Sequence, residues 1–170
     1  PQKDFGYDIS DFEDVGEIYG TMEDFDKMMT AAKKLGLRII MDLVPNHSSD
    51  EHKWFLESKS RKNNNPKRDW YVWRPGKKDS KGKTVGPPNN WRTMFCMDEE
   101  CSGWEYDATT DEYYYHCFLK GQPDFNWRNE ELQAAYLDIL RFWLRKGVDG
   151  FRVDAFAYML EDPEFRDEPV

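Results

Sequence analysis

Residues 37–44, LRIIMDLV, form the first of two short apolar runs that decide the fold of this chain. The second run is GFRVDA at residues 150–155. Near-continuous apolarity over so few residues is typical of strands that are buried on both faces, as in a parallel sheet. We therefore expect two parallel strands of one sheet, covered on both sides.

A helix is predicted before each strand. Thr21 and Asp24 form a capping box, and the apolar residues that follow recur at the spacing of one buried helix face. Asn129 is the expected N-cap of a second helix, whose apolar stripe ends at Gly147. A further short helix is expected before Pro163. The order helix, strand, insertion, helix, strand and helix predicts an α/β protein with parallel strands.

The segment between the two strands differs in composition. From Ser48 to about Lys120 the chain is rich in Asn, Lys, Asp, Pro, Trp and Tyr, and residues 71–73 and 113–118 look like short strands. A structureless loop of this length is implausible in a compact protein. We expect a compact, irregular lobe with little helix beyond its first turns.

Charge and aromatic content limit the class of protein. The 33 acidic and 24 basic residues give a net charge of −9, which disfavours nonspecific binding to nucleic acid or anionic membranes. Aromatic residues make up 16% of the chain, whereas disordered chains are poor in them. No apolar run approaches the ~20 residues of a membrane span, and the first residues show no signal-peptide pattern. The remaining classes of protein are an enzyme acting on neutral substrates, a protein-binding module and a fragment of a larger protein.

The three cysteines are too few for a disulfide scaffold. Cys96 and Cys101 could close a small loop, which would imply an oxidising compartment, and three reduced thiols are an equally weighted alternative. Cys117 stands apart from this pair. No Cys or His spacing matches a metal site, so no metal is predicted.

Polar side chains collect toward the carboxyl ends of the two predicted strands. Asp42 and His47 lie at or after the end of the first strand, and Arg152 and Asp154 lie on the second. Active sites of parallel α/β sheets gather at this edge, so we expect these residues to converge there. An ion pair inside the sheet is the alternative explanation for Asp42 and Arg152, because buried charges are costly unless paired. Asp154 alternates with Arg152, which suits a nucleophile that a neighbouring cation keeps ionised.

Three ordered motifs resemble conserved regions of the α-amylase superfamily of glycoside hydrolases: DLVPNH at 42–47, QPDFN at 122–126 and GFRVDA at 150–155. Three further stretches resemble its α-glucosidase branch of maltases and oligo-1,6-glucosidases: DFGYDI at 4–9, SDEHKWF at 49–55 and PPNNW at 87–91. The resemblance covers nearly the whole chain, and the order of the motifs makes it specific.

This resemblance implies a partial (β/α)8 TIM barrel with an inserted small B domain after the third strand. Residues 1–48 would hold the loop after strand two, helix two and strand three, and residues 49–124 the B domain. Residues 125–170 would hold helix three, strand four and the start of helix four. The chain would then be a segment of a longer protein, and residues 122–126 are expected to shape the join between B domain and barrel.

The resemblance also implies the catalytic residues. Asp154 matches the nucleophile that forms a covalent glucosyl intermediate, and Arg152 matches the residue that orients it and keeps it ionised. A retaining reaction needs a second carboxyl group about 5–5.5 Å from the nucleophile. In the family this Glu follows strand five and a stabilising Asp follows strand seven, both beyond Val170.

Four residues match substrate-binding positions of the family. His47 corresponds to a hydrogen-bond donor to the bound glucose, Tyr7 to an aromatic platform under it, and Asp4 to a carboxylate that binds its outer hydroxyls. Asp42 corresponds to a buried acid that supports the site. No cofactor is predicted; Asn46 matches a calcium ligand of true α-amylases, but the α-glucosidase branch often lacks that ion, so calcium is not predicted.

The implied function is a retaining α-glucosidase that releases terminal α-1,4-linked glucose from maltose, malto-oligosaccharides or sucrose. Ala155 stands where members that prefer α-1,6 bonds tend to have Val. One alternative is a non-catalytic ectodomain of an amino-acid-transporter heavy subunit, which residues 140–150 resemble. The joint presence of Tyr7, His47, Arg152 and Asp154 favours an enzyme. An isomerising or transferring enzyme of the same family is the other alternative.

The expected partner is a small oligosaccharide or disaccharide, with no nucleic acid and with membrane contact only through an anchor outside this segment. The oligomeric state is left open. The potential Cys96–Cys101 bridge and the closing Asp-Glu-Pro segment favour an extracellular or cell-surface location, with the cytoplasm as the alternative.

Overall fold

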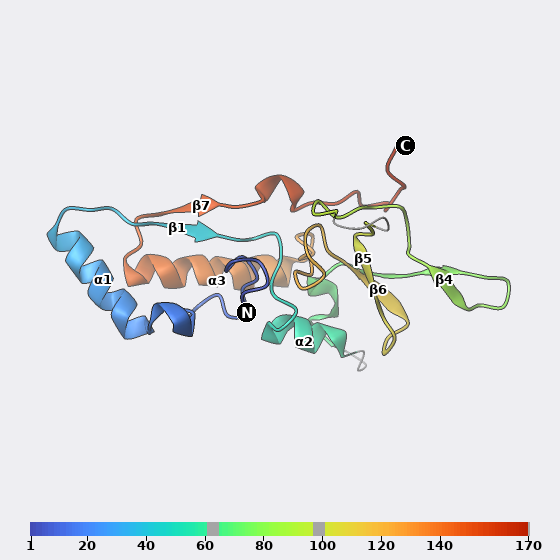
Figure 1. Ribbon diagram of the computed structural model, residues 1–170, viewed down its shortest axis with the longest axis horizontal. Helices are drawn as coiled ribbons and strands as arrows, with labels where there is room; N and C mark the ends of the chain where they lie inside the picture. The colour runs from blue at the N-terminus through green and yellow to red at the C-terminus, as the bar shows by residue number, and fades with distance from the viewer. Residues whose placement is uncertain (61–64, 97–100, 170) are drawn as a thin grey trace.

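The two predicted strands pair in parallel in the computed structural model, which describes residues 1–60, 65–96 and 101–169. Strand β1 spans Ile40–Leu43 and strand β7 spans Gly150–Val153, with Ile40 opposite Gly150 and Leu43 opposite Val153. Figure 1 shows them side by side. The parallel pairing is confirmed, although both strands are shorter than the apolar runs that predicted them.

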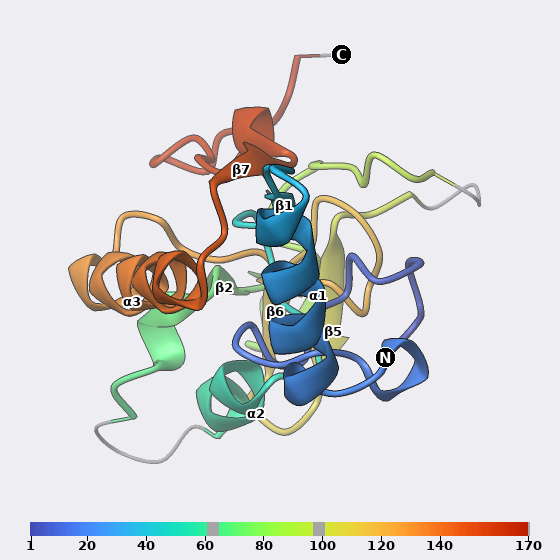
Figure 2. The ribbon, with the colours of Figure 1, turned by 90° about the vertical axis from the view of Figure 1, so that its left-hand side faces the viewer.

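Both predicted helices form with the expected caps. Helix α1 spans Met22–Lys34, and Thr21 and Asp24 exchange the hydrogen bonds of a capping box. Helix α3 spans Glu130–Lys146, and the side chain of its N-cap Asn129 accepts a hydrogen bond from Leu132 N. The helices lie on the same side of β1 and β7 (Figures 1 and 2).

The main apolar core lies where these helices meet the sheet and the N-terminal loop. Trp143 of α3 packs edge-on against Phe25 of α1, with ring centroids 5.1 Å apart, and its Nε1 donates to Phe12 O at 2.7 Å. The opposite face of the strands is open: Ile40 is 67% exposed, and the side chains of Arg152 and Asp42 are 55% and 44% exposed. Within this chain α1 and α3 cover the same face, so the prediction of strands covered on both faces is met on one face only.

The segment between β1 and α3 folds into a compact lobe of short elements, as predicted. In its described residues it begins with helix α2 and the 3-10 turn η2, which strands and loops follow. The elements are α2 (Lys53–Lys59), η2 (Arg68–Trp70), β2 (Trp73–Pro75), β3 (Lys77–Lys78), β4 (Thr84–Gly86), β5 (Trp104–Asp107) and β6 (Glu112–Tyr115). The antiparallel sheet has the order β2-β6-β5, and β3 pairs with β4. The domain boundaries at residues 48 and 124 stay predictions.

Two further 3-10 turns complete the described elements. Turn η1 spans Glu17–Tyr19 in the N-terminal loop. Turn η3 spans Phe156–Tyr158, shortly after Asp154, which follows the last residue of β7. The short helix predicted before Pro163 is therefore a single 3-10 turn.

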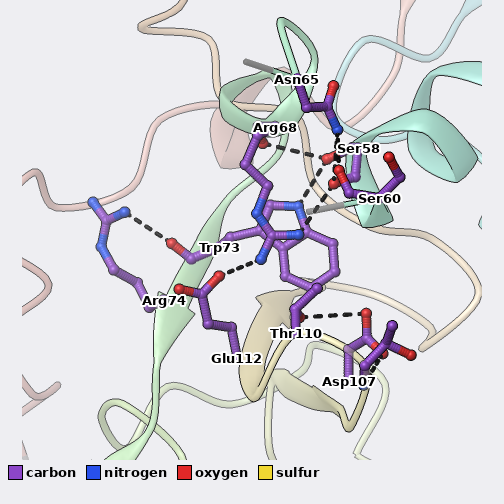
Figure 3. A network of polar contacts seen from close by, with 10 residues as sticks. Ser58, Ser60, Asn65, Arg68, Trp73, Arg74, Asp107, Thr110 and Glu112 are labelled. Carbon is purple, nitrogen blue, oxygen red and sulfur yellow. Dashed lines mark hydrogen bonds and ion pairs between the residues drawn. The ribbon is translucent and has the colours of Figure 1, made fainter. Parts of the chain in front are cut away.

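An Arg68-centred network ties the lobe's helix to its sheet (Figure 3). The guanidinium of Arg68 lies over the ring of Trp73, 3.7 Å from its centroid, and pairs with Glu112 of β6. Arg68 Nη1 also donates to Ser58 O at 3.1 Å, and Trp73 Nε1 donates to Ser58 Oγ at 2.9 Å. The side chains of Arg68 and Glu112 are only 16% and 17% exposed, so the solvent weakens the attraction between the two charges very little.

Replacing Arg68 is expected to destabilise the lobe. Arg68→Ala removes the guanidinium that pairs with Glu112 and covers the ring of Trp73, and we expect a loss of about 2–4 kcal/mol in the free energy of unfolding. Urea denaturation of the full-length protein, followed by tryptophan fluorescence, measures this loss. Arg145→Ala, at an exposed position on α3, is the matched control. Equal stability of the two variants would contradict the structural role of this network.

Candidate active site

The charged residues of β1 and β7 meet at one edge of the sheet. Asp42 and Arg152 are opposite each other in the parallel register. Arg152 Nη1 lies 3.2 Å from Asp42 Oδ2 and 2.6 Å from Asp154 Oδ1, so one guanidinium binds both carboxylates. Desolvation opposes the charge of Arg152, but Asp154 and Asp42 outweigh it and raise the pKa of Arg152.

The side chains of this cluster are less buried than predicted. Asp42 is 44% exposed and Arg152 is 55% exposed, whereas Asp154 is 24% exposed. Asp42 does form the expected ion pair with Arg152 across the two strands, but the acid is half exposed in this chain rather than buried.

The N-terminal loop folds over the same edge. Tyr7 Oη donates to Asp42 Oδ2 at 2.8 Å, and this hydrogen bond raises the pKa of Tyr7. The buried Asp8 carboxylate accepts from Lys3 N at 2.9 Å and from Asp4 N at 3.2 Å, which holds the loop in a tight turn. Asp8 was not singled out from the sequence, although it stands in the DFGYDI motif.

His47 is buried in the segment that follows β1. Its Nε2 lies 3.0 Å from Tyr7 O, and Nδ1 lies 3.3 Å from the side-chain nitrogen of Asn46. Burial lowers the pKa of His47 to about 4, because loss of water outweighs the Tyr7 carbonyl and the nearby carboxylates. His47 is therefore a neutral imidazole at physiological pH, with one nitrogen able to donate and the other able to accept.

Gln122 connects the lobe to two of the predicted site residues. Its Nε2 donates to Asp4 Oδ2 at 2.8 Å and lies 3.0 Å from His47 Nε2. Its Oε1 accepts from Leu119 N at 3.1 Å, which orients the amide. Gln122 was expected only to shape the join between lobe and barrel, whereas it also touches the site. The available signal was its place in the QPDFN motif.

A cavity of about 440 Å³ lies where the sheet edge, the N-terminal loop and the lobe meet. It is lined by Asp4, Tyr7, His47, Phe95, Phe118, Asp154, Ala155 and Tyr158. Four predicted site residues thus share one cavity, and Asp42 and Arg152 contact two of them, Tyr7 and Asp154. A larger cavity of about 640 Å³ between the N-terminal loop, β1 and α3 contains Asp42 but neither His47 nor Asp154, so we place the candidate site in the first.

Three aromatic residues of this cavity were missed from the sequence. Phe118 is the centre of the group, with its ring 5.4 Å from His47, 5.4 Å from Phe95 and 5.5 Å from Tyr158. Phe95 and Phe118 come from the lobe, and Tyr158 comes from η3. High aromatic content was the only hint of this wall, because no periodic pattern links the three positions.

Two carboxyl groups, the buried Asp124 and the half-buried Glu161, form no salt bridge within the described part of the chain. Burial raises the pKa of Asp124 well above its usual value and that of Glu161 to about 7, and the negative charge of Glu161 adds to the effect on Asp124. Asn46 Oδ1, Asp124 Oδ2 and Glu161 Oε1 have no hydrogen-bond partner in the described part of the chain. Calcium takes six to eight oxygen ligands, and residues 1–60, 65–96 and 101–169 contain no group of three His, Cys, Asp or Glu that could hold a metal.

Cys96 and Cys101 form a disulfide in the structure, which is one of the two alternatives left open by the sequence. Cys117 is free and buried. The bridge lies next to Phe95, one of the residues lining the cavity.

The chain belongs to the α-amylase catalytic-domain family. The family model described as "Alpha amylase, catalytic domain" matches residues 1–170. The α-glucosidase of Schizosaccharomyces pombe is 49% identical over 170 residues, which cover the whole chain and 28% of that relative. The oligo-1,6-glucosidase of Parageobacillus thermoglucosidasius is 48% identical over 167 residues, covering 98% of the chain and 28% of the relative. The chain thus spans less than a third of these relatives.

Solved structures agree with this assignment. The trehalulose synthase of Pseudomonas mesoacidophila MX-45 superposes with a TM-score of 0.89 at 47% identity, covering 98% of the chain and 28% of that structure. The trehalose-6-phosphate hydrolase of Bacillus licheniformis has a TM-score of 0.89 at 42% identity, covering 99% of the chain and 28% of that structure. The resemblance to the α-amylase superfamily and its α-glucosidase branch is confirmed.

The predicted extracellular or cell-surface location is wrong. The matches to yeast and bacterial α-glucosidases and oligo-1,6-glucosidases favour the cytoplasmic alternative. The inference from a Cys96–Cys101 bridge to an oxidising compartment does not hold, even though the structure contains the bridge. No helix among the described residues has the length and apolarity needed to span a membrane.

Glu161 is expected to make the stability of the protein depend on pH. Its folded pKa of about 7 lies above the ordinary 4.5, so the folded state binds the extra proton between these values. The free energy of unfolding should therefore fall by up to about 3 kcal/mol as pH rises from 4.5 to 8. Glu161→Gln should remove this decrease, as measured by urea denaturation across that range. Glu164→Gln, at a position 70% exposed, serves as the control, and a pH dependence that Glu161→Gln leaves unchanged would refute the assignment.

Proposed function

We propose that the protein containing this chain is a glycoside hydrolase, a retaining α-glucosidase that releases terminal α-1,4-linked glucose from maltose, malto-oligosaccharides or sucrose. The observation that carries this proposal is the position of Asp154. Its carboxylate lines the cavity, and Arg152 Nη1 lies 2.6 Å from it. A carboxylate nucleophile must be ionised and directed at substrate, and an adjacent guanidinium supplies both conditions.

In the proposed reaction, an Asp154 oxygen attacks the anomeric carbon of the terminal glucose. The glycosidic bond breaks, and the leaving oxygen takes a proton from a general acid. Water then cleaves the glucosyl ester, so two inversions at the anomeric carbon give net retention. The resemblance to the family assigns the general acid to a Glu beyond Val170, and the described residues supply the nucleophile and its Arg152 partner.

Asp4, Tyr7 and His47 are the proposed binding residues for the terminal glucose. All three line the cavity with Asp154. A neutral sugar offers hydroxyl groups for hydrogen bonds and C–H faces for aromatic contact. The Asp4 carboxylate accepts hydrogen bonds from the hydroxyl groups of the sugar. The uncharged His47 forms a hydrogen bond with the sugar, and the Tyr7 ring packs against the apolar face of the sugar. Asp42 acts through Tyr7 Oη and Arg152, which it contacts at 2.8 and 3.2 Å.

The barrel assignment is part of the same proposal. We infer that β1 and β7 are the third and fourth strands of a (β/α)8 barrel, with residues 49–124 as its B domain. Their parallel pairing across an inserted lobe and α3 supports this. The cavity at the carboxyl ends of these strands is where barrel enzymes place their active sites.

Ala155 is the proposed determinant of linkage preference. It lines the cavity directly after Asp154, and its methyl side chain leaves room that a Val would fill. A difference of this size is worth roughly 1–3 kcal/mol of discrimination. We propose that this room favours α-1,4 and sucrose-type bonds over α-1,6 bonds.

A second candidate is an isomerising or transferring enzyme. It is favoured by the TM-score of 0.89 to a trehalulose synthase, and it would use the same covalent intermediate. The two candidates differ in what attacks the intermediate, water or a sugar hydroxyl. Product analysis with sucrose separates them, since hydrolysis yields free glucose and fructose and isomerisation yields a new disaccharide.

Asp154→Asn is expected to abolish hydrolysis in the full-length protein. The substitution keeps the shape and removes the attacking charge, so turnover of an aryl α-glucoside should fall by at least roughly 1,000-fold. Folding should survive, because Asn keeps the shape of Asp and can still accept a hydrogen bond from Arg152, although breaking the ion pair costs about 3–5 kcal/mol where such a pair is buried. Circular dichroism checks the fold, and a mechanism-based glucosyl label should attach to Asp154 in the wild type.

Asp138→Asn, an exposed substitution on α3, controls for the loss of one carboxylate. It should leave turnover unchanged. Normal turnover by a folded Asp154→Asn variant would overturn the role of Asp154. A wild-type protein with no glycosidase activity would instead favour the transporter-subunit alternative.

A further inference from the structure

The PPNNW motif binds the chain segment that follows η3. Asn90 N donates to Asp167 Oδ1 at 3.0 Å. The Asn90 side chain donates from Nδ2 to Glu168 O at 3.0 Å and accepts from Glu168 N at 2.6 Å. Asn90 is itself exposed, and its side chain meets the backbone of Glu168 as a neighbouring strand would.

The two residues beside Asn90 bind the same segment. Trp91 Nε1 donates to Arg166 O at 2.8 Å, and its ring stacks on Phe165 with centroids 5.2 Å apart. Asn89 Nδ2 donates to Phe165 O at 3.1 Å, and the Arg74 guanidinium lies 3.7 Å from the Phe165 ring centroid. Figure 1 shows this C-terminal stretch, in red, running beside the lobe. We call residues 89–91 and 165–168 together the latch.

The latch closes a loop that begins at the proposed nucleophile. Asp154 N donates to Leu43 O at 2.8 Å, which fixes the start of the loop to β1. Ala155, in the left-handed region with φ 52°, and Tyr158 then line the cavity. The loop therefore has one end held by the sheet and the other end held by the lobe, with cavity-lining residues between them.

The wall of the cavity depends on where this loop lies. Phe118 belongs to the lobe and Tyr158 to the loop, and their rings meet edge to face at 5.5 Å. A loop held at one end only samples many conformations, and ordering each residue costs roughly 1–2 kcal/mol of backbone entropy. The latch restricts that freedom before substrate arrives, which is preorganisation of the site.

We propose that Asn90, Trp91 and Asp167 are positioning residues of the reaction: by docking residues 165–168 on the lobe, they hold Ala155 and Tyr158 against Phe118 and so set the width of the sugar-binding cavity. This inference rests on the proposed function of Asp154. Asn90 is the best place to test it, because its side-chain hydrogen bonds go to Glu168. Asn89, by contrast, also accepts from Trp104 Nε1 at 2.7 Å inside the lobe.

The test uses Asn90→Ala in the full-length enzyme, with active sites counted by a mechanism-based covalent glucosyl inactivator. Loss of two hydrogen bonds, each worth roughly 0.5–1.5 kcal/mol, should raise the KM for maltose and an aryl α-glucoside about 3- to 10-fold. The kcat per counted site should stay within about twofold, because the Arg152–Asp154 pair is untouched. Lys81→Ala, at an exposed position in the β3–β4 turn, is the control and should leave KM unchanged.

Asp167 supplies a conservative pair of variants. Asp167→Asn keeps an oxygen that accepts from Asn90 N and should have a KM near the wild-type value, whereas Asp167→Ala should raise KM as Asn90→Ala does. Hydrogen–deuterium exchange of residues 155–168 should increase in both alanine variants and not in Asp167→Asn. If Asn90→Ala fails to fold, as judged by circular dichroism, the Asp167 pair decides the question.

If the latch only stabilised the fold, the latch variants would have fewer active sites and an unchanged KM. That result would overturn the inference. Equal KM values for Asp167→Ala and Asp167→Asn would also overturn it. A wild-type protein without glycosidase activity would refute the proposed function and, with it, the positioning role. An active wild type whose KM is not changed by the latch variants would refute the positioning role alone.

Discussion

The guanidinium of Arg152, bound between the carboxylates of Asp42 and Asp154, is the interaction on which the candidate site depends. It exists because β1 and β7 pair in parallel with Asp42 opposite Arg152. A shift of one residue in that register would send Asp42 to the other face of the sheet. Tyr7 joins the same group through Asp42, so the N-terminal loop takes its place from this pairing as well.

The cavity is built from segments far apart in the chain, and each contributes a different property. The sheet edge supplies Asp154 with its cation, and the N-terminal loop supplies Asp4 and Tyr7. The lobe supplies the aromatic wall and Gln122, which hydrogen-bonds Asp4 at 2.8 Å. Because no single element forms the cavity, contacts between the lobe and the loop after β7 affect its shape even when they lie outside it.

Electrostatics around the cavity combine the Arg152–Asp154 ion pair with groups whose pKa is shifted by burial. His47 is neutral because burial lowers its pKa to about 4, and Glu161 titrates near neutral pH because burial raises its pKa to about 7. Asp154, next to Arg152, and Asp4 are the two carboxylates that line the cavity. A neutral sugar can be bound there by hydrogen bonds and ring contacts.

The sequence by itself determined the local elements and the family. The capping box at Thr21, the cap at Asn129 and the two apolar runs depend on neighbouring residues, and the ordered motifs identified the α-amylase superfamily. Only the tertiary structure decided the rest, since Gln122 reaches Asp4 across 118 positions of the chain and Phe118 meets Tyr158 from another element. The neutrality of His47 likewise follows from what packs around its ring. Burial and long-range contact are properties of the packed chain, and local patterns do not contain them.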